Sequence, residues 1–81
     1  MKIQHEPEKS QFTASIDGSD ELALLTYTLI NAESVNFDYS YVPMTFRGKG
    51  IAKKLVDFGF EWAKQENYQI RASCSYVARF L

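Results

Sequence analysis

The sequence predicts a small α/β protein, with a twisted, mainly antiparallel sheet, one main amphipathic helix and a short C-terminal helix. In the first half of the chain, apolar and polar residues alternate over three successive segments. From residue 50 onward, apolar residues instead recur every three or four positions, which is the period of a helix. The 81 residues are 46% hydrophobic and 23% charged, close to the averages for globular domains. We therefore expect one domain over residues 1–81.

The first half predicts an antiparallel meander of strands. A short edge strand at 3–5 is followed by strands at 10–16, 21–30 and 35–41. Short polar turns at 17–20 and 31–33 separate the last three strands, as in hairpins. Apolar residues of the last strand alternate with polar ones, so we expect them to share one face as core and pocket wall: Val35, Phe37, Tyr39 and Tyr41.

The second half predicts the main helix at 50–65, a last strand at 69–73 and a second helix from Ser75. The apolar side of the main helix comprises Ile51, Ala52, Leu55, Val56, Phe58, Gly59, Trp62 and Ala63. A glycine inside a helix costs about 1 kcal/mol relative to alanine, so Gly59 indicates a close approach of the helix to the sheet. Asn67 can adopt the left-handed conformation that ends a helix.

Composition excludes several classes of protein. No apolar run reaches the ~20 residues of a membrane span, and the N-terminus lacks the apolar core of a signal peptide. One cysteine and one histidine leave neither an internal disulfide nor a structural zinc set, so we expect no metal. These features predict a cytoplasmic protein. The sequence stops where its last helix begins, which leaves open a further C-terminal segment.

Charge is distributed unevenly along the chain. Residues 1–42 carry two cationic and seven acidic side chains, whereas residues 43–81 carry seven cationic and three acidic ones. Four of those seven cations fall between residues 47 and 54. Such a basic corner indicates either a local anionic ligand or a solvated helix face.

The segment 45–52 lies between a predicted strand and the main helix, and we expect the functional site of the protein there. A helix N-terminus offers unpaired N–H groups and partial positive charge to an anion. Gly48 and Gly50 would allow a ligand to approach the backbone, although they could also serve only a tight turn. The segment is not a Walker loop, and Lys53 stands where a dinucleotide fingerprint needs its third glycine.

The run Arg-Gly-Lys-Gly-Ile-Ala at 47–52 resembles the R/Q-x-x-G-x-G/A motif of the GNAT superfamily of N-acetyltransferases. The likeness extends to Cys-Ser-Tyr-Val at 74–77 and covers roughly residues 10–81. It points to the branch of very short, minimal GNAT-like proteins. Two departures accompany it: Tyr39 stands where that branch usually has histidine, and the N-terminal helices of full-size members have no counterpart here.

The resemblance implies binding of acetyl-coenzyme A. The backbone amides of 47–52 would hold its pyrophosphate, and the pantetheine arm would lie along the strand at 39–42. Lys49, Lys53 or Lys54 could reach the ribose 3′-phosphate. The expected cofactor-binding residues are Tyr41, Val42, Arg47, Gly48, Lys49, Gly50, Ile51 and Ala52.

Cys74 is the candidate catalytic residue. It begins a predicted helix, whose dipole would lower the pKa of the thiol and favour the thiolate. In the GNAT layout it would also lie near the acetyl group, so it could accept that group covalently. Alternatively, Cys74 is a small apolar filler of the core. Tyr39 and Tyr76 are weaker candidates, as proton donors to the departing thiol.

Three functions remain open at this stage. The first is a small N-acetyltransferase acting on an unidentified amine, directly or through Cys74. The second is a non-catalytic acyl-CoA-binding module. The third is single-stranded nucleic-acid binding through aromatic and basic residues, which the overall acidity disfavours. An exposed strand edge would also permit a homodimer.

Overall fold

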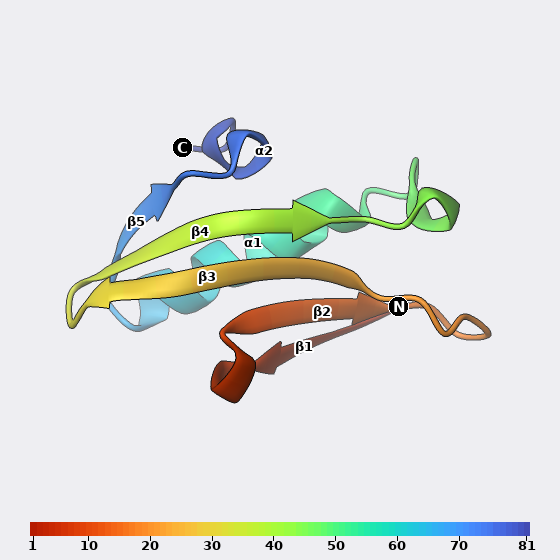
Figure 1. The fold of residues 1–81 in the computed structure, drawn as a ribbon, viewed down its shortest axis with the longest axis horizontal. Helices are drawn as coiled ribbons and strands as arrows, with labels where there is room; N and C mark the ends of the chain where they lie inside the picture. The colour runs from red at the N-terminus through yellow and green to blue at the C-terminus, as the bar shows by residue number, and fades with distance from the viewer.

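The computed structural model describes residues 1–81 as one five-stranded sheet with a long helix across one of its faces (Figure 1). The sheet order is β1-β2-β3-β4-β5. The strands are β1 Lys2–Glu6, β2 Gln11–Ser15, β3 Ala23–Asn31, β4 Ser34–Tyr41 and β5 Gln69–Ala72. The helices are the 3₁₀ turns Pro7–Lys9 and Met44–Phe46, the main helix α1 Ile51–Gln65 and the short α2 Ser75–Ala78. Neither α-helix is long and apolar enough to cross a membrane.

The predicted antiparallel meander is present, and the structure adds the position of the last strand. Strands β1 to β4 pair in sequence as an antiparallel meander, and β5 returns parallel to β4 after α1. The predicted turn at 17–20 links β2 and β3, with Gly18 at φ +85°. Asn67 has φ +62°, and the N–H of Tyr68 bonds the Ala63 carbonyl at 2.8 Å, which closes the C-terminus of α1. The predicted mainly antiparallel α/β fold is confirmed.

The core lies between α1 and one face of the sheet. Its buried apolar side chains are Phe12, Ala14, Ala23, Leu25, Tyr27, Val35, Phe37, Phe46, Ile51, Leu55, Val56, Ala63 and Val77. A Cβ added at Gly59 would lie 3.0 Å from both Leu25 Cδ2 and Phe37 Cε1. Because those two side chains are fully buried and have little room to move, the helix approaches the sheet closely at this point, as predicted.

A bulge in β4 overturns one prediction. Thr26 pairs with Tyr39 and Tyr27 pairs with Phe37, so Asp38 is an extra residue in the ladder. The extra residue reverses the alternation of faces beyond it. Phe37 is therefore buried against α1, whereas Tyr39 is 52% exposed on the opposite, helix-free face. Tyr41 follows Tyr39 onto that face and is 44% exposed, so neither ring forms part of the core.

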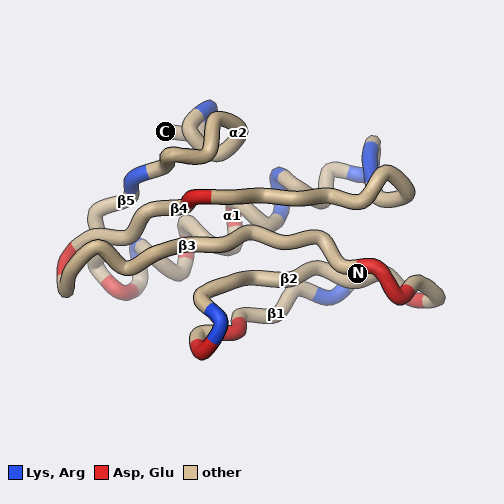
Figure 2. Tube along the Cα trace, viewed as in Figure 1, with Lys and Arg blue, Asp and Glu red and all other residues tan.

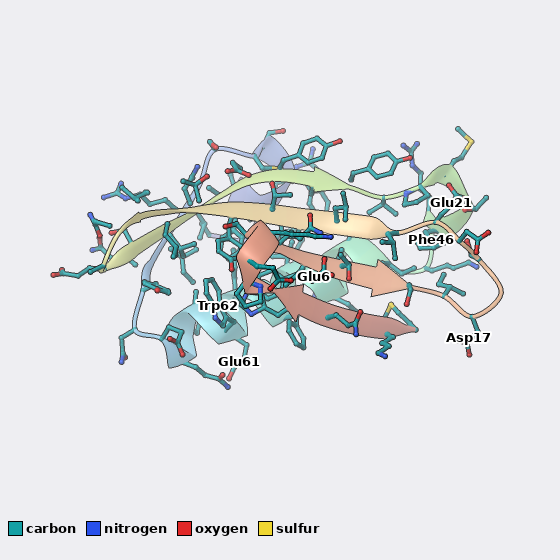
Figure 3. The ribbon with its side chains drawn as sticks, turned by 60° about the horizontal axis from the view of Figure 1, so that its bottom comes forward. Glu6, Asp17, Glu21, Phe46, Glu61 and Trp62 are labelled. Atoms are coloured by element: carbon teal, nitrogen blue, oxygen red, sulfur yellow. The ribbon has the colours of Figure 1, made fainter.

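One edge of the helix face is looser than the sequence pattern predicts. Phe58 is 44% exposed, and Trp62 is half-buried, where α1 passes beneath the N-terminal strands (Figure 3). The Trp62 ring lies 4.9 Å from that of His5 and 4.7 Å from that of Tyr27, centroid to centroid. His5 Nε2 and the Tyr27 hydroxyl share a hydrogen bond of 2.7 Å. Contacts among these aromatic rings thus cover the edge of the core that α1 by itself leaves partly exposed.

Strands β4 and β5 separate after a short parallel pairing. The ladder ends at Phe37 and Ala72, and the Phe37 carbonyl then accepts the backbone N–H groups of Ser73 and Cys74, each at 3.2 Å. Beyond this point the chain leaves the sheet for α2, which is only four residues long (Figure 1). The remainder of β4 is therefore unpaired on that side. We call the separation of β4 from β5 and α2 the gap, and Phe37 its apex.

Candidate functional site

The loop before α1 begins the site. The two glycines predicted to be special both have positive φ, +80° at Gly48 and +72° at Gly50. A Cβ at either position would meet no protein atom within 4 Å, so the loop needs glycine for its backbone conformation and not for space within the protein. Gly50 occupies the position immediately before α1, in the left-handed region. The loop geometry therefore sets the direction of the first helical amides.

The first turn of α1 has unpaired N–H groups. No side chain caps this helix, and the first backbone hydrogen bond back to the loop is donated by Lys54 to the Gly50 carbonyl at 3.1 Å. The amides of Ile51, Ala52 and Lys53 thus have no acceptor within the protein. Unpaired amides at the positive end of a 15-residue helix suit an anion such as a phosphate.

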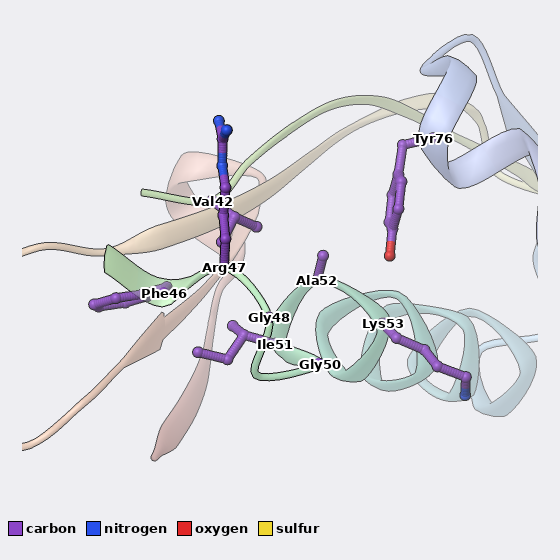
Figure 4. A pocket seen from close by; sticks show the side chains of 9 residues that line it. All are labelled: Val42, Phe46, Arg47, Gly48, Gly50, Ile51, Ala52, Lys53 and Tyr76. Atoms are coloured by element: carbon purple, nitrogen blue, oxygen red, sulfur yellow. The ribbon is translucent and has the colours of Figure 1, made fainter. Parts of the chain in front are cut away.

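A groove lies directly over these amides. It encloses about 220 Å³ between the end of β4, the start of α1 and α2, and we call it the cofactor groove (Figure 4). Its walls are Val42, Phe46, Arg47, Gly48, Gly50, Ile51, Ala52, Lys53 and Tyr76. Tyr76 reaches from α2 toward the first turns of α1, with its hydroxyl on the side of Ala52 and Lys53 (Figure 4).

The groove contains six of the eight residues predicted to bind the cofactor. Tyr41 is not among its walls, because the bulge at Asp38 turns its side chain to the helix-free face. Lys49 also lies outside it, exposed between the two glycines. Phe46 and Tyr76 were missed as groove residues. The position of Tyr76 in the segment 74–77 was a usable signal for its role, because Tyr76 follows the candidate catalytic Cys74 by only half a helical turn.

Basic residues gather in the loop before α1 and in the first turn of that helix (Figure 2). Arg47 and Lys53 line the groove, and Lys49 and Lys54 are exposed close by in the chain. Lys53 Nζ lies 2.9 Å from Asp57 Oδ2, and both side chains are more than half exposed. Such a surface pair contributes little to stability, so Lys53 can exchange Asp57 for a ligand phosphate at small cost.

Cys74 lies deeper in the gap than the cofactor groove does. Val42 and Tyr76 face the groove from opposite sides. Ser40 precedes Val42 by two residues, and Cys74 precedes Tyr76 by two, so both lie closer to the apex. Ser40 Oγ and Cys74 Sγ are 3.4 Å apart, within hydrogen-bonding distance for sulfur. Cys74 is half-buried and packs against the core. The gap thus has a basic mouth with free amides and a thiol near its apex.

The environment of Cys74 favours the thiolate. Burial alone raises the pKa of the thiol, but the hydrogen bond with the Ser40 hydroxyl and the N–H groups of Val77 and Tyr76 outweigh burial. The pKa of Cys74 consequently lies below its ordinary value. The sequence predicted this direction from the position of Cys74 at a helix N-terminus, and the two N–H groups belong to the first turn of α2; the hydrogen bond with Ser40 was not predicted. Tyr39, one of the alternative proton donors, is on the helix-free face, while Tyr76 lines the groove.

Comparisons with known proteins agree with this geometry. The sequence profile of the GCN5-related N-acetyltransferase family matches residues 11–81. Protein NATD1 of Xenopus tropicalis is 26% identical over 81 residues, covering all of this chain and 74% of that protein. Protein NATD1 of Bos taurus is 27% identical, covering all of this chain and 72% of its own length. The solution structure of a GCN5-like protein from Staphylococcus aureus superposes with a TM-score of 0.69 at 27% identity, covering 98% of this chain and 76% of that one.

Proposed function

Because this chain belongs to the GCN5-related N-acetyltransferase family, we propose that it binds acetyl-CoA in the cofactor groove and transfers the acetyl group to an amine. The unpaired amides of Ile51, Ala52 and Lys53 are the observation that carries this proposal. They lie at a helix N-terminus, between glycines of positive φ and among cations, where a pyrophosphate would bind.

The rest of the gap suits the remainder of the ligand. The unpaired side of β4 beyond Phe37 offers backbone groups to the amides of a pantetheine arm. Arg47, Lys49, Lys53 and Lys54 supply charge for the ribose phosphate at the mouth. A ligand extended from the loop toward the apex would bring its thioester close to Ser40 and Cys74.

Cys74 is the residue proposed to receive the acetyl group. Acetyl-CoA supplies an activated acetyl group as a thioester. The Cys74 thiolate would attack the acetyl carbonyl, forming a new C–S bond as the bond to coenzyme A breaks and the coenzyme leaves as its thiolate. A neutral amine would then attack the acetyl-cysteine, forming a C–N bond as the C–S bond breaks, which restores the Cys74 thiolate and releases one proton from nitrogen to solvent. Ser40 would stabilise the thiolate in both steps through its hydrogen bond.

Native mass spectrometry with acetyl-CoA tests the proposal directly. We expect a complex with acetyl-CoA and, after denaturation, an added mass of one acetyl group that maps to Cys74. Cys74→Ala should bind the cofactor with unchanged affinity and lose the adduct. Incubation with radiolabelled acetyl-CoA and a panel of amines then measures turnover.

Each outcome of these experiments assigns a role. Turnover by Cys74→Ala would indicate direct transfer from the cofactor to the amine. Binding without adduct or turnover would indicate the acyl-CoA-binding module. Absence of acetyl-CoA binding would overturn the proposed function altogether.

A further inference from the structure

Asp38, the bulge residue of β4, presents its carboxylate on the helix-free face. Thr26 and Thr28 donate their hydroxyls to its two oxygens, at 2.5 Å to Oδ1 and 2.6 Å to Oδ2. Both threonines alternate with the core residues of β3, which places them on the face away from α1. The carboxylate is therefore held in one orientation by two neighbours.

No cation forms an ion pair with this carboxylate, although Arg71 of β5 lies on the same face, opposite Asn36. The single ion pair of the protein joins Lys53 to Asp57, and neither β3 nor β4 contains a lysine or an arginine. Figure 2 accordingly shows β4 with an acidic segment and no basic one. Asp38 is half-buried, so water screens it only in part. A fixed, half-buried carboxylate with two neutral partners suits a positively charged ligand group.

Asp38 also lies beside the apex of the gap. It directly follows Phe37, whose carbonyl accepts the N–H groups of Ser73 and Cys74. On the same face, the Asn36 side chain bridges the two strands through two hydrogen bonds of 3.0 Å to Ser73. Asp38 of β4 and Arg71 of β5, which pairs with Asn36, are thus the charged residues beside the apex on the helix-free face.

The other face of the sheet is covered next to the apex. Helix α1 covers it, with Gly59 in close contact with Leu25 and Phe37 next to the apex. On the helix-free face, by contrast, Tyr39 and Tyr41 are about half exposed and Leu24 pairs with Tyr41. These side chains form an apolar surface that continues from Asp38 along β4. Aromatic rings also attract a cation placed over their faces.

We propose that the acceptor is a primary amine with an aromatic or apolar body, whose ammonium group binds Asp38 and whose body lies on Tyr39 and Tyr41. This inference rests on the proposed function and adds to it the acceptor class and its recognition residue. The ammonium would complete the hydrogen bonding of a carboxylate that Thr26 and Thr28 orient. It would release one proton to solvent before its nitrogen, then neutral, attacks the acetyl group.

Two probes of equal shape test the charge requirement in the CoA-loaded protein. 2-Phenylethylamine, cationic at pH 7, and 2-phenylethanol, neutral, would each be titrated into the ¹⁵N-labelled protein. With the amine, we expect amide shifts at 26–28 and 36–41, and an affinity at least tenfold higher than with the alcohol. Asp38→Asn should lose about tenfold in amine affinity and leave alcohol binding unchanged. Asp17→Asn, an equal loss of charge on the exposed β2–β3 turn, should change neither.

In turnover assays with 2-phenylethylamine, Asp38→Asn should raise KM about tenfold with a much smaller change in kcat. Equal affinity for the two probes, or equal KM in Asp38→Asn and wild type, would overturn the inference. Binding of the coenzyme is followed separately, through the chemical shifts of the amides of 47–53. Loss of that response would refute the proposed function, whereas an intact coenzyme response with an indifferent Asp38 refutes only the acceptor assignment.

Discussion

Replacing Gly50 by alanine isolates the backbone conformation of the cofactor loop. Gly50 has φ +72° and ψ +16°, and a Cβ there would contact no protein atom. The substitution therefore introduces no clash within the protein, only the strain of a left-handed L-residue. Gly18, at φ +85° in the β2–β3 turn, provides a matched control because its Cβ would also meet nothing.

The size of the effect follows from these values. A left-handed L-residue costs about 1–2 kcal/mol. Both Gly50→Ala and Gly18→Ala should accordingly lower the free energy of unfolding by about 1–2 kcal/mol, and each kcal/mol lowers Tm by roughly 4–8 °C for a domain of this size. Relaxation of that strain at residue 50 would redirect the amides of Ile51 and Ala52. Each hydrogen bond to a charged group contributes about 1.5–3 kcal/mol, so loss of one should weaken coenzyme A binding about tenfold or more.

Thermal unfolding by circular dichroism and calorimetric titration with coenzyme A measure the two effects. We expect Gly18→Ala to lose stability and keep its affinity, and Gly50→Ala to lose both. If Gly50→Ala binds coenzyme A as tightly as wild type, the loop does not hold the phosphates. If both variants lose affinity equally, the loss reflects general destabilisation and the reasoning also fails.

Further predictions concern the thiol, the aromatic cluster and its histidine. The rate of Cys74 alkylation by iodoacetamide should reach half its maximum at a pH below the ordinary cysteine pKa, and Ser40→Ala should move that midpoint upward; an unmoved midpoint would exclude the hydrogen bond as the cause. Trp62→Ala should cost about 2–3 kcal/mol in urea unfolding, less than the ~3–5 of a fully buried ring, and a loss below about 1 kcal/mol would contradict its packing on the sheet. Burial lowers the pKa of His5, with Glu8 and Glu66 opposing that shift, so the unfolded chain takes up the proton first; stability should decline as pH falls below about 6.5, and a flat profile from pH 7.5 to 5 would contradict this.

The sequence by itself determined the elements of this protein and their order. Hydrophobic period, turn residues and the capping Asn67 are local signals, and each acts within a few residues of where it stands. The loop at 47–52 was predictable for the same reason, because its glycines, cations and helix start are contiguous in the chain. The role of Gly59 was predictable as well, because a residue without a side chain on the apolar face of a helix lets the neighbouring sheet come close.

Only the tertiary structure decided which face each strand residue occupies and which distant residues meet. The bulge at Asp38 depends on the register between β3 and β4, and no local pattern distinguishes it from regular alternation. A one-residue shift there moved Tyr39 and Tyr41 to the helix-free face. The pairing of Ser40 with Cys74, 34 residues apart, likewise depends on where β5 separates from β4. Register and strand separation are set by packing between segments, and so they became visible only in the folded chain.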